Sequence, residues 1–492
     1  MNYRMVLFVL GRILGVEAVL MLLPLFTAVI YRENLLPFII PIAMLIAIAL
    51  LLSIKPPREK VMHAKDGFVC VGLSWIVMSI FGAIPFVMSG EISSYIDAFF
   101  ETVSGFTTTG ASILSDVESM SRGMLMWRSF THWIGGMGIL VFVLAIMPQS
   151  DKNNSRFMHL MRAESPGPSV GKIVPKISET SRIMYGIYII LTVLLAILLY
   201  AGGMPLFDTL CHTFGTAGTG GFGIKNDSIA SYSPYCQYVM ATFMILFGIN
   251  FNVYYFLLIR QFFKAIKSEE LWTYLSIIAV SVGVISFSVY GFYNLNALSG
   301  LSVNAEESFR MAYFQVASII STSGFSTVNF DLWPSLTHVI LVILMFIGAS
   351  AGCTGGGIKV SRIILLAKNA AREIKYILNP RVVKNVKFEG KRIDHETIRG
   401  TTSYLIVYIA LFTLSLVAVI AADGCDLTTG FTSIAACINN IGPGLSKVGP
   451  SSNFGWMTDF SKIVLCFNML AGRLELFPIL ILFSPYTWKK FM

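Results

Sequence analysis

The sequence predicts an all-α polytopic membrane protein in which four tandem repeats surround a central axis. Hydrophobic residues make up 55% of the 492 residues and charged residues only 13%, which is far outside the range of a soluble domain. Long uncharged stretches recur, each long enough to cross a bilayer as a helix. Between them lie four short loops of Thr, Ser, Gly and Asn, whose central glycines are 111, 103 and 118 residues apart. Four such loops at this spacing indicate a repeat protein.

Two spans open the chain, at residues 5–30 and 35–52. The first is too long for a cleaved signal peptide and contains Arg12 and Glu17, so we expect it to remain as a membrane helix. Uncharged spans follow at 67–88, 183–204, 271–292 and 403–422, and more polar spans at 124–147, 236–259, 336–358 and 461–484. We therefore expect two extra N-terminal transmembrane helices in 1–66 and four repeats, at 67–182, 183–268, 269–399 and 400–492, the third with a broken second span.

Each repeat is expected to contain a full span, a short re-entrant helix that ends in a Gly loop, and a second full span. The four Gly loops are residues 107–111, 218–222, 321–325 and 439–443. A re-entrant segment is tolerated at membrane depth only where protein or a water-filled path surrounds it. Four of them around one pseudo-fourfold axis would enclose such a path, as in a potassium channel.

The formal charge of +9 does not indicate a nucleic-acid partner, because the basic residues are distributed by loop. If the N-terminus is cytoplasmic, one set of loops contains nearly all the Lys and Arg residues, in segments 55–65, 152–182, 260–267, 359–399 and 489–490. The opposite loops contain only Arg32, Arg122, Lys225, Arg310 and Lys447. This asymmetry is the positive-inside pattern. It places both termini in the cytoplasm and opens the four Gly loops toward the outside.

The direction of the short helices favours a cation. Acidic residues lie in or near their first turns, where they suit the positive end of a helix, at Asp97, Asp208, Glu306 with Glu307, and Asp426. The partially negative ends would then converge below the Gly loops, whose backbone carbonyls can replace a hydration shell. Glycine allows the chain to turn those carbonyls inward, and the surrounding Thr, Ser and Asn residues are small and uncharged.

Six motifs in order resemble the Trk/Ktr/HKT superfamily of cation transporters over nearly the whole chain. They are SGFTTTGA at 104–111, the Gly-Phe pairs at 221–222 and 324–325, GASAGCTGGGIK at 348–359, NIGPG at 440–444 and AGR at 471–473. The two extra N-terminal spans look like the TrkH type of bacterial potassium-uptake membrane subunit rather than the shorter Ktr subunits.

The resemblance implies a selectivity filter with one glycine per repeat, at Gly110, Gly221, Gly324 and Gly442. The flanking filter residues would be Thr108, Thr109, Thr219, Gly220, Thr322, Ser323, Asn440 and Ile441. In the superfamily, Ser at the first of the four glycine positions goes with sodium preference, so four glycines favour potassium. K⁺ would be the bound and transported ion, with no cofactor. One glycine per repeat implies looser discrimination against Na⁺ than in a tetrameric potassium channel.

The third repeat's second span is interrupted by a glycine-rich stretch. It includes Gly348, Ser350, Gly352, Cys353, Thr354, Gly355, Gly356 and Gly357. The spacing of Gly352, Gly357 and Lys359 does not fit a phosphate-binding P-loop. Its small residues instead predict a flexible unwound segment across the path, which the resemblance identifies as the intramembrane gate.

Arg473 is the second gate candidate. An Arg within an apolar span is costly and usually faces a water-filled interior. A snorkelling or paired Arg is the alternative, although Glu475 is too close in sequence to share its face easily. The resemblance implies that Arg473 projects beneath the filter and repels cations.

Asp116, Asp227 and Asp331 follow the glycines of repeats one to three by 6, 6 and 7 residues. They could form an outer ring that concentrates cations at the mouth. Capping of the following turns is the favoured interpretation, since Asp commonly does this. Lys447 near the equivalent place in repeat four would interrupt any ring.

The sequence contains no pattern typical of an enzyme active site, so a membrane enzyme is only a minor alternative. A sodium- or proton-coupled transporter on the same scaffold stays open. One charge moved through 100 mV releases about 2.3 kcal/mol, and this sustains roughly a 50-fold gradient, so voltage alone could drive uptake. The resemblance further implies a homodimer in the bacterial inner membrane that binds a cytosolic nucleotide-binding regulatory ring of the TrkA type, while the basic loops could contact anionic lipid.

Overall fold

The computed structural model describes residues 2–54, 64–136, 138, 177–295, 303–380 and 385–488. The described chain is almost entirely helical, apart from a hairpin of β1 (Lys387–Phe388) and β2 (Lys391–Arg392). Six of its helices are long and apolar enough to cross a membrane, or seven if a bent pair is counted as one span. The predicted loops at 55–65 and 152–182 and the residues 489–490 lie mostly outside the described residues.

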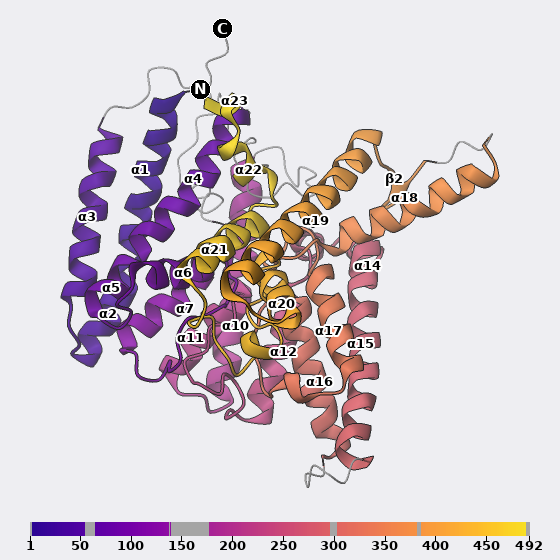
Figure 1. Cartoon of the computed structure of the whole chain (residues 1–492), viewed down its shortest axis with the longest axis horizontal. Coiled ribbons are helices and arrows are strands. Elements are labelled where there is room, and N and C mark those ends of the chain that lie inside the picture. Colours follow the sequence, from indigo (N-terminus) through magenta and orange to yellow (C-terminus); the bar gives the residue numbers. More distant parts are fainter. Residues whose placement is uncertain are drawn as a thin grey trace.

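The two predicted N-terminal spans are present. α1 (Tyr3–Leu20) continues with little interruption into α2 (Leu22–Tyr31), and α3 (Leu36–Ser53) runs beside α1 at one side of the molecule (Figure 1). The contact between them is close, because a Cβ built on Gly11 would lie 2.7 Å from the Cβ of Leu52. α1 also packs on the first span of repeat one, so the N-terminal helices cover that repeat.

The first span of each repeat lies where the hydrophobic pattern predicts it. These spans are α4 (Ala64–Gly82) with α5 (Ile84–Ser89), α10 (Ile177–Ala201), α15 (Glu269–Leu295) and α19 (His395–Asp423). Large apolar side chains such as Ile190, Phe287 and Leu414 are exposed on these helices. Such exposure fits a surface in contact with lipid rather than with water.

A short helix precedes each Gly loop. The four are α6 (Tyr95–Phe106), α11 (Leu206–Gly218), α16 (Ala305–Ile320) and α20 (Leu427–Ile438). Ser94 and Asp426 cap the starts of α6 and α20 by accepting from the backbone N–H groups of Asp97 and Thr429. The predicted acidic residues therefore lie at the helix starts, where the partial positive charge of the helix favours them.

Two of the second spans, those of repeats two and four, have a break that the sequence analysis does not predict. In repeat one, α7 (Arg122–Gly136) is followed by residues outside the described part. In repeat three, α17 (Ser335–Ile347) ends at the glycine-rich stretch, and α18 (Val360–Leu378) projects away from the body (Figure 1). Repeat two is also broken, between α12 (Pro234–Phe247) and α13 (Phe251–Leu258), which meet at 89°. Repeat four is broken between α21 (Asp459–Arg473) and α22 (Phe477–Phe483).

Local residue chemistry explains the two unexpected breaks. Gly248 ends α12, and Asn250 caps α13 by accepting from the N–H of Asn252 over 3.0 Å. Between α21 and α22, Glu475 and Leu476 both have positive φ, and a proline occupies the first turn of α22. The remaining elements are α14 (Phe262–Ile266), α23 (Pro485–Trp488) and the 3₁₀ turns Phe330–Leu332 and Ser446–Val448.

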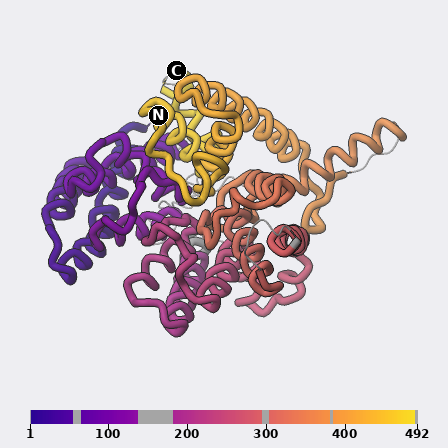
Figure 2. Tube along the Cα trace, turned by 60° about the horizontal axis from the view of Figure 1, so that its bottom comes forward, coloured from indigo at the N-terminus to yellow at the C-terminus, as the bar shows by residue number. Residues whose placement is uncertain are grey.

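The segments follow one another around a common centre when the molecule is viewed as in Figure 2. Buried apolar side chains form two clusters. One mainly joins the N-terminal helices, α4–α7 and α19–α22, and the other mainly joins α10 with α12–α18. The four short helices lie in and between these clusters, so their loops meet in the interior.

Candidate functional site

The four short helices end in the same way. In each, the second loop residue donates its N–H to a carbonyl three residues earlier, and the next residue donates to a carbonyl five residues earlier. This pair of bonds is the Schellman motif, which satisfies carbonyls at a helix C-terminus. The longer bonds join Thr109 to Ser104, Gly220 to Gly215, Ser323 to Ser318 and Ile441 to Ala436, over 2.8, 2.8, 2.8 and 2.9 Å.

The motif normally places glycine at its left-handed position, but here that position holds Thr or Asn. The residues are Thr108, Thr219, Thr322 and Asn440, with φ of 56°, 56°, 60° and 54°. A non-glycine residue in this conformation costs about 1 to 3 kcal/mol, and such strain clusters at functional sites. All four side chains are buried. The strain is therefore repeated in register in all four loops.

The glycine two residues later is required for two separate reasons. Gly110, Gly221, Gly324 and Gly442 have φ of 79°, 80°, 80° and 103°, a region that side chains resist. Each also packs against the next loop. A Cβ on Gly110 would lie 2.0 Å from the carbonyl oxygen of Gly220, and one on Gly221 1.9 Å from that of Ser323.

The same contact continues around the remaining loops. A Cβ on Gly324 would lie 2.0 Å from the carbonyl oxygen of Ile441, and one on Gly442 would lie 2.8 Å from that of Thr109. The last contact returns to the first loop. The four Gly loops therefore touch in a closed cycle, each by its glycine against a backbone carbonyl of its neighbour.

A second cycle of contacts lies just beyond the glycines. The segment after loop one meets the segment after loop two where the Val117 N–H donates to Asn226 Oδ1 over 2.8 Å. The segment after loop two meets the segment after loop three where the Ile229 N–H donates to the Ser326 carbonyl over 3.0 Å. Three further residue pairs complete the cycle. The Ser446 N–H donates to Asp331 Oδ1 over 2.9 Å, the Phe454 N–H donates to the Ser112 carbonyl over 2.9 Å, and Gly455 lies against Ile113.

A cavity of about 200 Å³ is lined by all four glycines and by residues of the segments that follow them. Two cationic side chains, Arg128 and Lys225, also line it. Of the residues considered for an acidic ring, Asp116 accepts from the Glu118 N–H of its own turn, whereas Asp331 accepts from the Ser446 N–H of a neighbouring loop. The favoured interpretation as a turn cap therefore describes Asp116 but not Asp331.

The glycine-rich stretch of repeat three lies against the third and fourth Gly loops. The N–H of Gly356 donates to Thr322 Oγ1 over 2.6 Å, and a Cβ on Gly356 would lie 2.3 Å from the Asn439 carbonyl oxygen. A Cβ on Gly355 would lie 2.7 Å from the Ser321 carbonyl oxygen. Gly348 packs on Gly356 and Gly357 with equally little room. The stretch can approach the loops this closely because glycines, which have no side chain, occupy the contact positions.

The other predicted residues of this stretch are tied to the break in repeat two. The N–H of Ser350 donates to the Gly248 carbonyl over 3.1 Å, the carbonyl of Gly352 accepts from the Phe251 N–H over 3.2 Å, and Thr354 Oγ1 donates to the Phe247 carbonyl over 3.3 Å. Cys353 is only half-buried, and its thiol accepts from the Gly355 N–H. Lys359 Nζ donates to the Gly355 carbonyl.

Arg473, the second predicted gate residue, contacts the glycine-rich stretch directly. Its Nη1 donates to the Thr354 carbonyl over 2.6 Å, and its Nη2 donates to the carbonyls of Gly136, over 2.6 Å, and Gly135. Glu475, its neighbour in sequence, forms an ion pair with Arg362. Arg473 therefore joins the glycine-rich stretch to the end of α7.

Sequence reasoning missed two buried acidic residues at this site and their partners. Glu101 and Arg128 form a buried ion pair beside the first two Gly loops. Glu270, which is 2% exposed, accepts from the Ala351 N–H over 2.7 Å and from Asn250 Nδ2 over 3.0 Å. Acidic residues within or next to apolar spans were the available signal. Their partners are distant in sequence, so the pairs themselves could not be read from it.

Comparison with known proteins identifies the family. The family model described as TrkH, cation transport protein, matches residues 37–490. The chain belongs to the TrkH family. The family that the sequence motifs indicated is therefore confirmed. This TrkH-family chain is a multi-pass membrane protein.

Curated relatives extend the match over the full length. The TrkH-family chain is 35% identical to the Trk system potassium uptake protein TrkH of Salmonella typhimurium, with 100% of both chains covered. It is 33% identical to the Trk system potassium uptake protein TrkG of Escherichia coli, with 99% of each covered. A solved structure, the potassium transporter TrkH from Vibrio parahaemolyticus, matches with a TM-score of 0.86 at 31% identity, covering 99% of this chain and 100% of that one.

Proposed function

We propose that this protein takes up K⁺ across the bacterial inner membrane through a gated, channel-like selectivity filter driven by the membrane potential. The observation that carries the proposal is the closed cycle of the four Gly loops around the cavity. In the proposed arrangement, four helix–re-entrant helix–loop–helix repeats surround a pseudo-fourfold pore. The relatives named potassium uptake proteins support the choice of ion.

The filter would bind K⁺ through backbone carbonyls of the loops, because glycine allows the chain to turn these groups toward the cavity that the four glycines line. Uncharged loop residues leave no side-chain charge to trap the ion, and the C-terminal ends of the four short helices add partial negative charge below it. Glycine at all four positions favours K⁺ over Na⁺, as the superfamily resemblance implies.

The gate would be the glycine-rich stretch at 348–357 together with Arg473. Their direct contact through the Thr354 carbonyl supports a joint role, since a movement of one must break or carry the other. A guanidinium beneath the filter would oppose cation passage while it remains there. In the proposal, regulation opens the path by displacing both.

The proposal includes partners. The basic loops would face the cytoplasm, with both termini, and would meet a nucleotide-binding regulatory ring of the TrkA type or anionic lipid. α18 projects from the body and exposes Ile374, Ile377 and Leu378 near its end (Figure 1). Such exposure supports a protein contact there, either the second copy of a homodimer or the ring.

One observation favours the alternative of ion-coupled transport. Glu17 in α1 is fully buried, and neither of its carboxyl oxygens has a hydrogen-bond partner within the described residues. Ionisable groups within membrane spans often mark ion or proton pathways. If Glu17 carried a proton in each cycle, uptake would require a proton gradient and Glu17→Gln would abolish it.

The deciding experiment is ⁸⁶Rb⁺ uptake into proteoliposomes that contain the purified protein, at a set voltage and without a proton or sodium gradient. Voltage-driven uptake that K⁺ blocks far better than Na⁺ supports the channel-like path. Uptake that requires a sodium or proton gradient would replace it with the coupled mechanism.

A further inference from the structure

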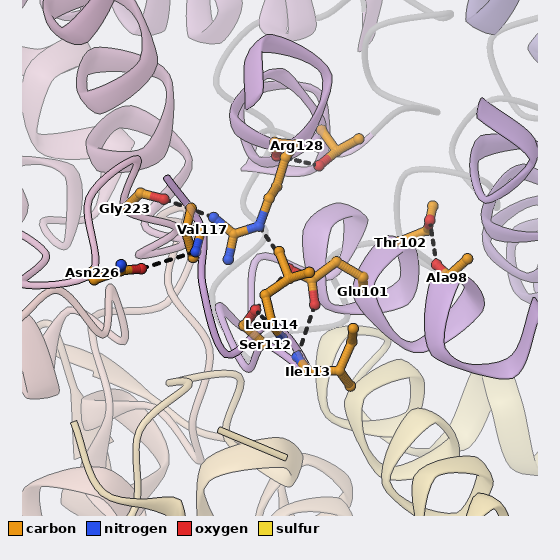
Figure 3. Close-up of polar contacts among 11 residues, drawn as sticks. Ala98, Glu101, Thr102, Ser112, Ile113, Leu114, Val117, Arg128, Gly223 and Asn226 are labelled. Carbon is orange, nitrogen blue, oxygen red and sulfur yellow. Dashed lines mark hydrogen bonds and ion pairs between the residues drawn. The ribbon is translucent and has the colours of Figure 1, made fainter. Parts of the chain in front are cut away.

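A buried ion pair joins α7 to α6 and contacts the residues that follow the first two Gly loops (Figure 3). Arg128 on α7 and Glu101 on α6 approach to 2.6 Å between Nε and Oε1, and their side chains are 3% and 0% exposed. A buried ion pair is weak evidence for stability, because the loss of hydration offsets most of its attraction. The geometry of its other contacts indicates what else it does.

The pair reaches both neighbouring loops at the same register. Glu101 accepts from Ser112 Oγ over 2.9 Å and from the Ile113 N–H over 3.0 Å, while Arg128 Nη1 donates to the Gly223 carbonyl over 2.7 Å. Ser112 follows Gly110 by two residues, and Gly223 follows Gly221 by two. The ion pair therefore connects equivalent positions in the segments that directly follow loops one and two.

The ring of Phe222 completes the connection. The guanidinium carbon of Arg128 lies 3.6 Å from the centroid of this ring, which directly follows Gly221. Arg128 thus contacts the second loop twice, through a carbonyl and through an aromatic face, and it lines the cavity that the glycines share. The rigid planar guanidinium can hold several partners in fixed directions, which an ammonium group cannot do.

The other repeats do not have an acidic residue at the position of Glu101, nine residues before the glycine. Those positions are occupied by His212, Gln315 and Ser433. His212 contacts the Tyr232 hydroxyl at 3.2 Å, and Ser433 bonds the Gly430 carbonyl of its own helix. The amide of Gln315 has no partner within the described residues. The charged connection at this position is therefore particular to the first repeat.

We propose that Arg128 and Glu101 are positioning residues that fix the spacing of the first and second filter loops and so set the preference for K⁺ over Na⁺. The inference rests on the proposed function. A cage of carbonyls discriminates by size only if it resists contraction around the smaller ion. The ion pair supplies this resistance on one side of the cycle. Its two charges compensate each other, so the guanidinium beside the cavity does not repel the transported cation.

The test compares single variants for the concentrations of K⁺ and Na⁺ that half-block ⁸⁶Rb⁺ uptake. Arg128→Gln is expected to lower the ratio of Na⁺ to K⁺ blocking concentrations at least tenfold. Arg128→Lys is expected to lower it by a similar factor, because Lys keeps the charge but cannot hold Glu101, Gly223 and Phe222 together. A wild-type ratio in Arg128→Lys would overturn the positioning role, because the positive charge at residue 128 would then be sufficient for the preference.

Asp97→Asn is the matched control. It breaks another ion pair of the same helix, formed with Lys462, whose side chain is 5% exposed. The ratio is expected to stay within twofold. If Arg128→Gln does not fold, Ser112→Ala tests the inference in its place. This variant removes the hydrogen bond from Ser112 Oγ, just after loop one, to Glu101. It is expected to lower the ratio about threefold, and an unchanged ratio overturns the inference.

A second readout separates this inference from the proposed function. The thermal stability of the purified protein is measured in K⁺ and in Na⁺, without any flux. Greater stabilisation by K⁺ in the wild type, lost in Arg128→Lys but kept in Asp97→Asn, supports the positioning role even if voltage-driven uptake is absent. If K⁺ stabilises the wild type, Arg128→Lys and Asp97→Asn to the same extent relative to Na⁺, the positioning role is contradicted even if voltage-driven uptake is present.

Discussion

Thr322 and Gly356 join the third Gly loop to the glycine-rich stretch by a hydrogen bond of 2.6 Å from the Gly356 N–H to Thr322 Oγ1. Thr322 is also one of the four strained loop residues, with φ of 60°. A residue of the proposed filter therefore holds a residue of the proposed gate without any intermediate group. Movement of the gate must break this bond or disturb the filter.

Thr322→Val should increase basal ⁸⁶Rb⁺ uptake at least about fivefold. The change removes the acceptor but keeps the branched shape, and a buried N–H without its acceptor costs about 1 to 3 kcal/mol, which disfavours the closed arrangement. Thr337→Val is the control, since its hydroxyl bonds the Pro334 carbonyl at the start of α17. Equal uptake by the two variants would show that the bond does not hold the gate closed.

Arg473→Ala should raise voltage-driven uptake several-fold. The substitution removes the bonds to the Thr354 and Gly136 carbonyls and also the positive charge of the proposed gate. Arg372→Ala, which removes a surface pair with Glu373, should leave uptake unchanged. Unaltered flux in Arg473→Ala would exclude Arg473 from the barrier.

Glu270→Gln should loosen the same stretch from the other side. The two carboxylate oxygens accept from the Ala351 N–H and from Asn250, whereas an amide offers one acceptor and one donor. We expect a higher basal uptake and a lower unfolding temperature. Glu269→Gln is the adjacent control, because Glu269 is partly exposed and pairs with Lys368. Equal basal uptake and equal unfolding temperatures in Glu270→Gln and Glu269→Gln would show that Glu270 does not hold the stretch in place.

Gly110→Ser should lower the preference for K⁺ over Na⁺ at least about tenfold. A side chain at φ of 79° is strained, and its Cβ would lie 2.0 Å from the Gly220 carbonyl oxygen, so the cycle of loops must widen or shift. Gly283→Ser on α15 is the control, since a Cβ added there would meet no atom within 4 Å. Competition by K⁺ and Na⁺ for ⁸⁶Rb⁺ uptake measures both, and an unchanged preference in Gly110→Ser would count against the filter.

The spans and the short helices could be predicted because their determinants are local. A run of about 20 apolar residues must form a helix in a bilayer, whatever its neighbours are. Acidic residues at helix starts, such as Asp97 and Asp208, and glycines at helix ends are equally local signals. The break at Gly248 was missed because the hydrophobic pattern continues through it. The break at Glu475 was missed although Arg473, Glu475 and Pro478 interrupt the pattern there.

The sequence by itself determined the membrane environment, the repeat spacing and the glycines of the four loops, because composition, helix length and backbone freedom are properties of short segments. Only the tertiary structure decided which carbonyl each glycine meets and that Arg128 pairs with Glu101, Glu270 with Ala351 and Arg473 with Thr354. The last two partners are 119 residues apart along the chain. A buried charged or polar group requires a partner, and which group becomes its partner depends on which residues lie close to it in the folded chain. That closeness leaves no signal in the local sequence.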